Sequence, residues 1–107
     1  MKILFVCTAA QQRSPTGVEV VKEYFPWNEA KFVGVHPFAE VPITKEAIDW
    51  ADVIFAMEKM HKDFIIENFP HEMIGKNIII LGIPDIYEKN DLELIELLRE
   101  KLKKYLY

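Results

Sequence analysis

The sequence is poor in cysteine, and this shortage excludes several classes of protein. One cysteine in 107 residues cannot form an internal disulfide, which excludes a disulfide-rich secreted scaffold. The three histidines, His36, His61 and His71, lack metal-ligand spacing, so we expect no metal site. No apolar run approaches the ~20 residues of a membrane helix. Together these absences favour a cytoplasmic globular protein.

The sequence also lacks an excess of positive charge. Thirteen Lys and Arg stand against 17 Asp and Glu, which gives a formal net charge of -4. The one basic cluster, residues 101–104, is offset by Glu96 and Glu100. Neutralising phosphates along a nucleic acid needs clustered Lys and Arg. We therefore expect neither a nucleic-acid nor a membrane partner.

The opening residues, "MKILFVC", imitate a lipoprotein signal. However, the apolar run from Ile3 to Val6 is shorter than the roughly 7–15 residues of a signal h-region. Phe5 and Val6 are also bulky where small residues precede a lipidated cysteine. We expect Cys7 to carry no lipid.

Short apolar runs alternate with helical patterns along residues 1–107, which we interpret as one domain. Strands are predicted at residues 3–6, 31–35, 52–56 and 77–83. Helices are predicted at residues 15–25, 45–50, 58–69 and from about 91, the last with an apolar stripe of Ile95, Leu98, Leu102 and Tyr105. The expected caps are Ser14 before Pro15, Thr44, and Asn90 in a capping box with Glu93.

Continuous β-branched runs between helices predict parallel strands covered on both faces, and hence a small doubly wound α/β domain. In such sheets ligands bind at the carboxyl ends of the strands. Cys7 follows the first strand, Met57 the third, and Pro84 and Asp85 the fourth. We therefore expect these three loops to open on the same edge of the sheet.

The segment "VCTAAQQRSPTG" has the chemistry of an anion site. A loop that leads from a buried strand to a helix N-terminus gathers backbone N–H groups and the positive end of the helix dipole. A cysteine placed there is expected to react as a thiolate. Arg13 adds a planar fork for two phosphate oxygens, and Ser14 can donate its hydroxyl to the sulfur. The predicted phosphate-binding residues are Thr8, Ala9, Ala10, Gln11, Gln12, Arg13 and Ser14.

Phosphoryl transfer to a cysteine also needs a proton for the leaving group and a base for the water that follows. Asp85 is the first candidate, because it follows the fourth strand and Pro84 restricts its backbone. Asp91 is the second candidate, although it also suits the start of the last helix. Asp85 as a simple turn residue stays open, since Asp is favoured in turns.

These residues resemble a known family. Cys7, five intervening residues and Arg13-Ser14-Pro15, directly after an N-terminal strand, resemble the low-molecular-weight protein tyrosine phosphatases, above all their short, predicted phosphatase-like members. "WADVIFAME" (50–58) and "IPDIY" (83–87) extend the resemblance over most of the chain. It implies a four-stranded parallel sheet of order 2-1-3-4 with helices on both faces.

The resemblance also implies roles. Cys7 would be the nucleophile, Arg13 the phosphate clamp, Ser14 the thiolate partner and Asp85 the general acid. Phe38 and Tyr87 would line a slot for an aromatic ring, and their being ordinary surface or core aromatics is an equal alternative. The expected substrate is a phosphotyrosine protein or a small aryl phosphate, with inorganic phosphate or vanadate as ligands and no cofactor.

The sequence departs from the family pattern in three places. Ala9 and Ala10 stand where the family usually has Gly and Asn, and Ala10 suits left-handed backbone poorly, so the loop is expected to be strained, differently bent or less active. The acid loop reads Pro-Asp-Ile rather than Asp-Pro. Gln12 replaces a second cysteine found in many members.

Other functions stay open beside the phosphatase. A cysteine phosphocarrier of the sugar phosphotransferase IIB type has similar size and topology, but it lacks the Arg-Ser ending of this loop. A non-catalytic oxyanion-binding module also stays open, because Ala10 stands where the family usually has Asn. An arsenate reductase would need further cysteines for an internal relay. The plain alternatives are Cys7 as a buried filler and Arg13 in a surface salt bridge.

Overall fold

Among residues 1–106, which the computed structural model describes, four strands alternate with four helices. In chain order they are β1 (Lys2–Cys7), α1 (Arg13–Tyr24), β2 (Glu29–Gly34), α2 (Lys45–Trp50), β3 (Val53–Ala56), α3 (Lys59–Asn68), β4 (Ile78–Ile80) and α4 (Leu92–Leu102). No helix in this part of the chain is long and apolar enough to span a membrane.

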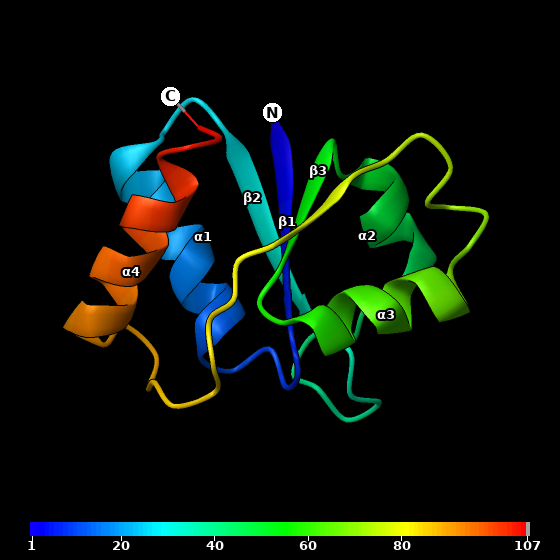
Figure 1. Cartoon of the computed structure of the whole chain (residues 1–107), viewed down its shortest axis with the longest axis horizontal. Coiled ribbons are helices and arrows are strands. Elements are labelled where there is room, and N and C mark those ends of the chain that lie inside the picture. The colour runs from blue at the N-terminus through cyan, green and yellow to red at the C-terminus, as the bar shows by residue number, and fades with distance from the viewer. Residues whose placement is uncertain (107) are drawn as a thin grey trace.

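The strands form one parallel sheet in the order β2-β1-β3-β4, which confirms the predicted fold class and strand order. Helices α1 and α4 cover one face of the sheet, and α2 and α3 cover the other (Figure 1). The loops that leave the carboxyl ends of β1, β2, β3 and β4 all lie at the lower edge in Figure 1. The segments that follow the strands are therefore neighbours in space.

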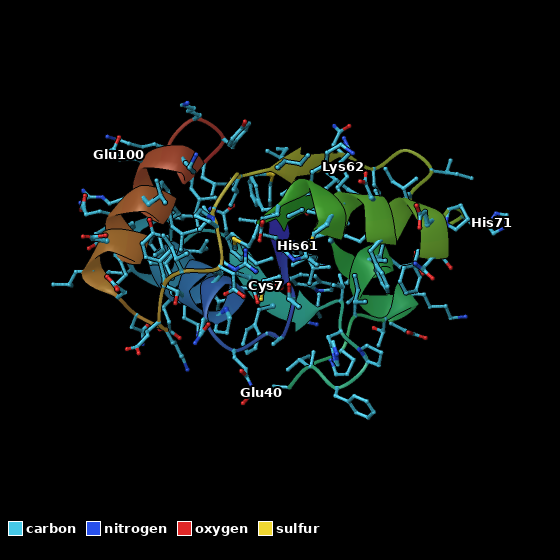
Figure 2. The ribbon with its side chains drawn as sticks, turned by 60° about the horizontal axis from the view of Figure 1, so that its bottom comes forward. Cys7, Glu40, His61, Lys62, His71 and Glu100 are labelled. Carbon is cyan, nitrogen blue, oxygen red and sulfur yellow. The ribbon has the colours of Figure 1, made fainter. Side chains whose placement is uncertain are left out.

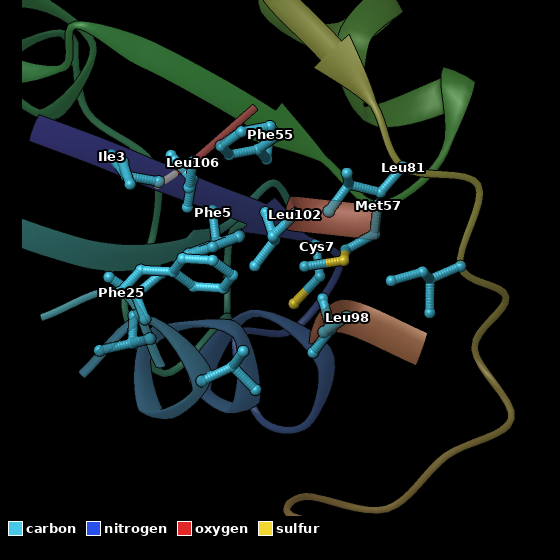
Figure 3. Close-up of a cluster of buried hydrophobic side chains, with 14 of the residues drawn as sticks. Ile3, Phe5, Cys7, Phe25, Phe55, Met57, Leu81, Leu98, Leu102 and Leu106 are labelled. Carbon is cyan, nitrogen blue, oxygen red and sulfur yellow. The ribbon is translucent and has the colours of Figure 1, made fainter. Parts of the chain in front are cut away.

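Side chains alternate along β1, and this explains why the strand is apolar at every position after Lys2. Ile3, Phe5 and Cys7 belong to the core cluster shared with α1 and α4, part of which Figure 3 shows. Leu4 and Val6 belong to the second cluster, on the side of α2 and α3. Each such buried side chain contributes roughly 1.5–3 kcal/mol. The central strand is thus held from both faces, and its carboxyl end is a rigid base for the loop after Cys7.

Helix α1 begins two residues earlier than predicted. Gln12 occupies the N-cap position without a side-chain cap, and Arg13 is the first helical residue. The predicted cap, Ser14, is wrong because its hydroxyl faces the sulfur of Cys7 instead. Pro15 is tolerated in the first turn, where backbone N–H groups lack an intrahelical partner anyway.

The last strand and the last helix also differ from the prediction. β4 ends at Ile80 rather than at Ile83, and Gly82 beyond it takes a positive φ of 71°. The N–H groups of Leu81 and Ile83 still donate to the carbonyls of Ala56 and Met57, both at 2.8 Å. The N-cap of α4 is Asp91, whose carboxylate accepts from the backbone N–H of Glu93 at 2.8 Å. Asn90, the predicted cap, instead lies in the left-handed region with φ 63°.

The stripe predicted for the last helix is shifted by one residue at its start. Leu94, Leu98 and Leu102 are the buried side chains of α4, whereas Ile95 is only partly buried. Tyr105 lies beyond the end of the helix and packs its ring against Phe55 at 5.6 Å between centroids. The predicted helical period is confirmed, but the face of α4 that packs into the core is the neighbouring one, which begins at Leu94.

Candidate active site

The loop between β1 and α1 is held in place by backbone hydrogen bonds from the segment that follows β2. The N–H of His36 donates to the carbonyl of Thr8 at 3.0 Å, and the N–H of Glu40 donates to the carbonyl of Ala9 at 3.1 Å. Gly34 permits this close approach, because a Cβ there would lie 2.5 Å from the Thr8 oxygen. The loop therefore has a defined shape.

Ala10 adopts the left-handed conformation, with φ 58°. A residue with a Cβ pays roughly 1–2 kcal/mol for that conformation. The strain expected from Ala at this position is therefore present. The residue is fully buried, so surrounding packing holds it there.

Cys7 ends β1 with its side chain almost fully buried. It packs in the cluster that also contains Met57 and Leu98 (Figure 3). Cys7 nevertheless lines a pocket, and its sulfur lies 2.9 Å from the hydroxyl oxygen of Ser14. The residue thus packs like a core cysteine, while its sulfur has a polar partner and the residue borders the pocket.

Arg13 is 2% exposed, which rules out the alternative of a surface salt bridge. Its Nη1 donates to the carboxylate of Glu58 and, at 2.8 Å, to the carbonyl of Ile83. Its Nη2 lies 3.5 Å from the Thr8 hydroxyl oxygen, and its Nε lies 3.7 Å from a carboxylate oxygen of Asp85. One side of the guanidinium is therefore anchored in protein, and the edge with Nε and Nη2 faces two residues of the pocket wall.

The pocket has a volume of about 110 Å³ and is lined by Cys7, Thr8, Ala9, Gln11, Gln12, Arg13 and Asp85. Pockets for drug-sized ligands are several times larger, at ≈ 300–1,000 Å³. This pocket suits the head of an oxyanion rather than a ring. The sulfur, the guanidinium edge and one carboxylate surround it.

Not every predicted residue reaches the pocket. Ala10 and Ser14 are fully buried and do not line it. Phe38 is 90% exposed and Tyr87 packs against the core cluster, and neither borders the pocket. Asp91 caps α4, so Asp85 is the candidate acid that borders the sulfur's pocket.

The structure adds two residues that the sequence analysis did not single out for this site. Glu58 caps α3 and holds Arg13, and His61, in the first turn of the same helix, bonds to Thr8. The N–H of Glu58 donates to Nδ1 of His61, which closes a capping box. Glu58 follows β3, so the rule that ligands bind at the carboxyl ends of parallel strands could have pointed to it. For His61 the sequence held no signal except its position three residues after Glu58.

His61 is fully buried at this junction. Burial and, to a smaller extent, the Arg13 guanidinium lower the pKa of His61 from 6.5 to about 4, although the charges of Glu58 and Asp85 act in the opposite direction. The imidazole is therefore neutral at neutral pH. Within residues 1–106, no three His, Cys, Asp or Glu side chains gather in a way that could hold a metal ion.

Comparison with known proteins gives one relative of known activity. The chain is 32% identical to the protein-arginine-phosphatase of Geobacillus stearothermophilus, and the alignment covers 64% of this chain. It spans only 62% of that relative's length. No family model matches the sequence.

Solved structures share the fold over nearly the whole chain. A low-molecular-weight protein tyrosine phosphatase from Bacillus subtilis is 26% identical, with 98% of this chain and 99% of that one covered and a TM-score of 0.70. Wzb of Vibrio vulnificus, solved with benzylphosphonate, is 20% identical, covers 97% of this chain and 95% of its own, and has a TM-score of 0.79. At that identity the second match speaks for the fold alone.

The parallel sheet and the loop after its first strand define the class as that of small phosphatase-fold proteins. Within it, the chain shares the fold of the low-molecular-weight protein tyrosine phosphatases and is similar in sequence to a protein-arginine-phosphatase. This confirms the resemblance carried by the Cys7-to-Pro15 segment.

Proposed function

We propose that the protein is a phosphomonoesterase that works through a phosphocysteine intermediate on Cys7. The observation that carries the proposal is the buried guanidinium of Arg13, which is anchored on one side by Glu58 and Ile83 and borders the pocket of the Cys7 sulfur. A fixed guanidinium edge binds two phosphate oxygens and neutralises the charge that moves onto them during transfer.

In the first step, the Cys7 thiolate attacks phosphorus as the bond to the leaving oxygen breaks. Asp85, in its carboxylic acid form, gives its proton to that oxygen. The Ser14 hydroxyl, 2.9 Å from the sulfur, stabilises the thiolate before attack. Arg13 and the loop N–H groups hold the three phosphoryl oxygens.

In the second step, water attacks the phosphocysteine, and the Asp85 carboxylate takes a proton from it. The P–S bond breaks, inorganic phosphate forms, and the Cys7 thiolate and the Asp85 acid are regenerated. Both steps use the same carboxyl group, first as acid and then as base. Neither step needs a cofactor.

We propose a phosphotyrosine protein or a small aryl phosphate as substrate. The pocket holds the phosphoryl group, and the rest of the substrate lies outside it, where Phe38 and Tyr87 are the predicted walls. Phosphoarginine is a second candidate, because the curated relative is a protein-arginine-phosphatase. A free nucleophilic thiol needs a reducing compartment, which supports the cytoplasm as the location.

The test is hydrolysis of p-nitrophenyl phosphate and of a phosphoarginine peptide, with vanadate as competitor. Cys7→Ser should abolish turnover of either substrate. Asp85→Asn should lower kcat by about 10²–10⁴-fold, the usual contribution of a general acid. Glu88→Gln, an exposed carboxylate in the same loop, is the matched control and should leave kcat unchanged.

Two other outcomes would overturn the proposal. A stable phosphorylated Cys7 that passes its phosphoryl group to an acceptor protein, with no release to water, would indicate the phosphocarrier. Binding of vanadate without turnover of either substrate would indicate an oxyanion-binding module.

A further inference from the structure

His61 uses both ring nitrogens, and its surroundings fix which one carries the proton. Nδ1 lies 3.0 Å from the backbone N–H of Glu58, and Nε2 lies 2.9 Å from the hydroxyl oxygen of Thr8. A backbone N–H can only donate, so Nδ1 is the acceptor and the neutral ring carries its hydrogen on Nε2. His61 therefore donates to Thr8. Thr8 comes from the loop after β1 and His61 from the first turn of α3, and the labels of His61 and Cys7 lie close together in Figure 2.

The Thr8 oxygen then has two donors facing it. Nε2–H of His61 occupies one lone pair, and Nη2–H of Arg13, at 3.5 Å, approaches the other. A hydroxyl has two lone pairs and a single proton. Both acceptor directions are thus used, and among residues 1–106 the Thr8 proton has no acceptor. Thr8 lines the pocket, so this proton is available to a bound anion.

We infer that His61 is a positioning residue that acts through Thr8: it orients the Thr8 hydroxyl so that this hydroxyl donates to an oxygen of the anion bound beside Cys7 and Arg13. The inference rests on the proposed function for its catalytic consequence, because the anion is then the transferring phosphoryl group. Its binding consequence does not depend on turnover. Inorganic phosphate should make the same hydrogen bond.

Glu58 is hydrogen-bonded to both Arg13 and His61 and so links the two side chains that face Thr8. Its carboxylate holds Arg13, and its N–H holds the ring of His61. The N-cap and the first turn of α3 thus orient a guanidinium edge and a hydroxyl toward the pocket. Such support by neighbouring groups keeps donors in place before the charge develops.

The alternative is that His61 only caps α3, as Gln does in other capping boxes. A capping role would affect stability and leave anion binding by the folded protein unchanged. The two roles are separated by substitutions at Thr8, which takes no part in the cap.

The experiment measures binding of inorganic phosphate by calorimetry, and kcat and KM for p-nitrophenyl phosphate, in Thr8→Val, Thr8→Ser, His61→Leu, His61→Gln and the double variant Thr8→Val/His61→Leu. A hydrogen bond to a charged group corresponds to a loss of roughly 10- to 100-fold when removed. We expect that loss of phosphate affinity in Thr8→Val and in His61→Leu. The double variant should lose no more than either single variant.

Two conservative variants should retain phosphate binding. Thr8→Ser keeps the hydroxyl, and His61→Gln keeps an N–H donor at the position of Nε2, so both should bind phosphate within a few-fold of wild type. His71→Leu, at an exposed histidine, is the matched control and should bind as wild type does. Thermal unfolding of each variant measures its effect on stability separately from its effect on phosphate affinity.

The inference is overturned if Thr8→Val binds phosphate as tightly as wild type, and this outcome does not require His61→Leu to fold. It is also overturned if losses in the double variant add. A wild type that binds phosphate without turning over either substrate would refute the proposed function, and the phosphate affinities would still decide the role of His61. A wild type that does not bind phosphate would refute both.

Discussion

Ala10 occupies left-handed backbone space although its methyl group makes that conformation unfavourable by roughly 1–2 kcal/mol. The loop keeps this shape because its neighbours, Thr8 and Ala9, are hydrogen-bonded to the segment after β2. The approach is possible because Gly34 has no side chain. A single small residue on β2 therefore controls the shape of a loop more than twenty positions earlier in the sequence.

Replacing Gly34 by Ala should distort the anion loop. The new Cβ would lie 2.5 Å from the Thr8 carbonyl oxygen and 2.8 Å from the Ala10 nitrogen, both of which are backbone atoms. We expect destabilisation of about 1–3 kcal/mol, as for other overpacked sites. We also expect loss of phosphate binding, measured by calorimetry on the folded fraction.

Gly75→Ala is the control for this substitution. Gly75 has φ 78° and no atom within 4 Å of an added Cβ, so the change costs stability through backbone strain alone. It should leave phosphate affinity unchanged. Equal affinity in Gly34→Ala and wild type would contradict the role given to Gly34.

At the scale of elements, α1 matters because it carries Arg13 and Ser14 at its first turn and rests directly on β1. The contact is made at Gly17, where an added Cβ would lie 2.9 Å from the ring of Phe5. That ring is fully buried and stacked on Phe55 at 5.6 Å between centroids, so it has little room to move. The close packing of α1 against β1 therefore depends on Gly17, a glycine inside the helix.

Gly17→Ala should destabilise the protein even though Ala is the better helix former. Helix propensity gains about 1 kcal/mol, whereas overpacking against a buried ring costs typically 1–3 kcal/mol. We expect a net loss of up to about 2 kcal/mol, measured by urea denaturation. Glu19→Ala, exposed on the same helix, should change stability by less than about 0.5 kcal/mol. A more stable Gly17→Ala variant would show that α1 is free to move away from the sheet.

The whole molecule brings together residues that are far apart in the chain. Arg13 bonds to Glu58, 45 residues away, and to Ile83, 70 residues away, across the edge where β1, β3 and β4 end. Parallel strands make this possible, since every crossover returns the chain to the same starting edge. The site is therefore assembled only when the complete sheet has formed.

Stability against pH should report on this assembly through His61. Burial lowers the folded pKa of His61 to about 4 from an ordinary value of 6.5, so between these values the unfolded chain binds a proton that the folded protein does not. The stabilisation is complete above pH 6.5 and is lost as the pH falls to about 4. The loss amounts to about 3 kcal/mol.

The measurement is the free energy of unfolding from urea denaturation at pH 7, 6, 5 and 4, for wild type and His61→Gln. Protonation of the ring is opposed by Arg13 and favoured by Glu58 and Asp85, and all three groups remain in the variant. Wild type should therefore lose about 3 kcal/mol more than His61→Gln over this range. Parallel curves would show that His61 titrates alike in the folded and unfolded states.

Much of the fold was predictable from short-range patterns. The apolar run of β1 predicts a strand buried on both faces, and the strand-end rule brings Cys7 and Asp85 to one edge, where both line the pocket. The predictions of helix caps were less accurate, because a polar side chain can form its hydrogen bond with more than one partner. Ser14 had a sulfur to face and does not cap α1, and Asp91 rather than Asn90 caps α4.

The sequence by itself determined the alternation of strands and helices, the parallel sheet and the segment that holds the cysteine and the arginine, because periodicity and motif spacing are properties of neighbouring residues. The tertiary structure alone decided that Glu58 anchors Arg13 and that His61 orients Thr8. Such contacts join residues about 50 positions apart, and their strength comes from burial at the edge of the sheet, which no local pattern encodes.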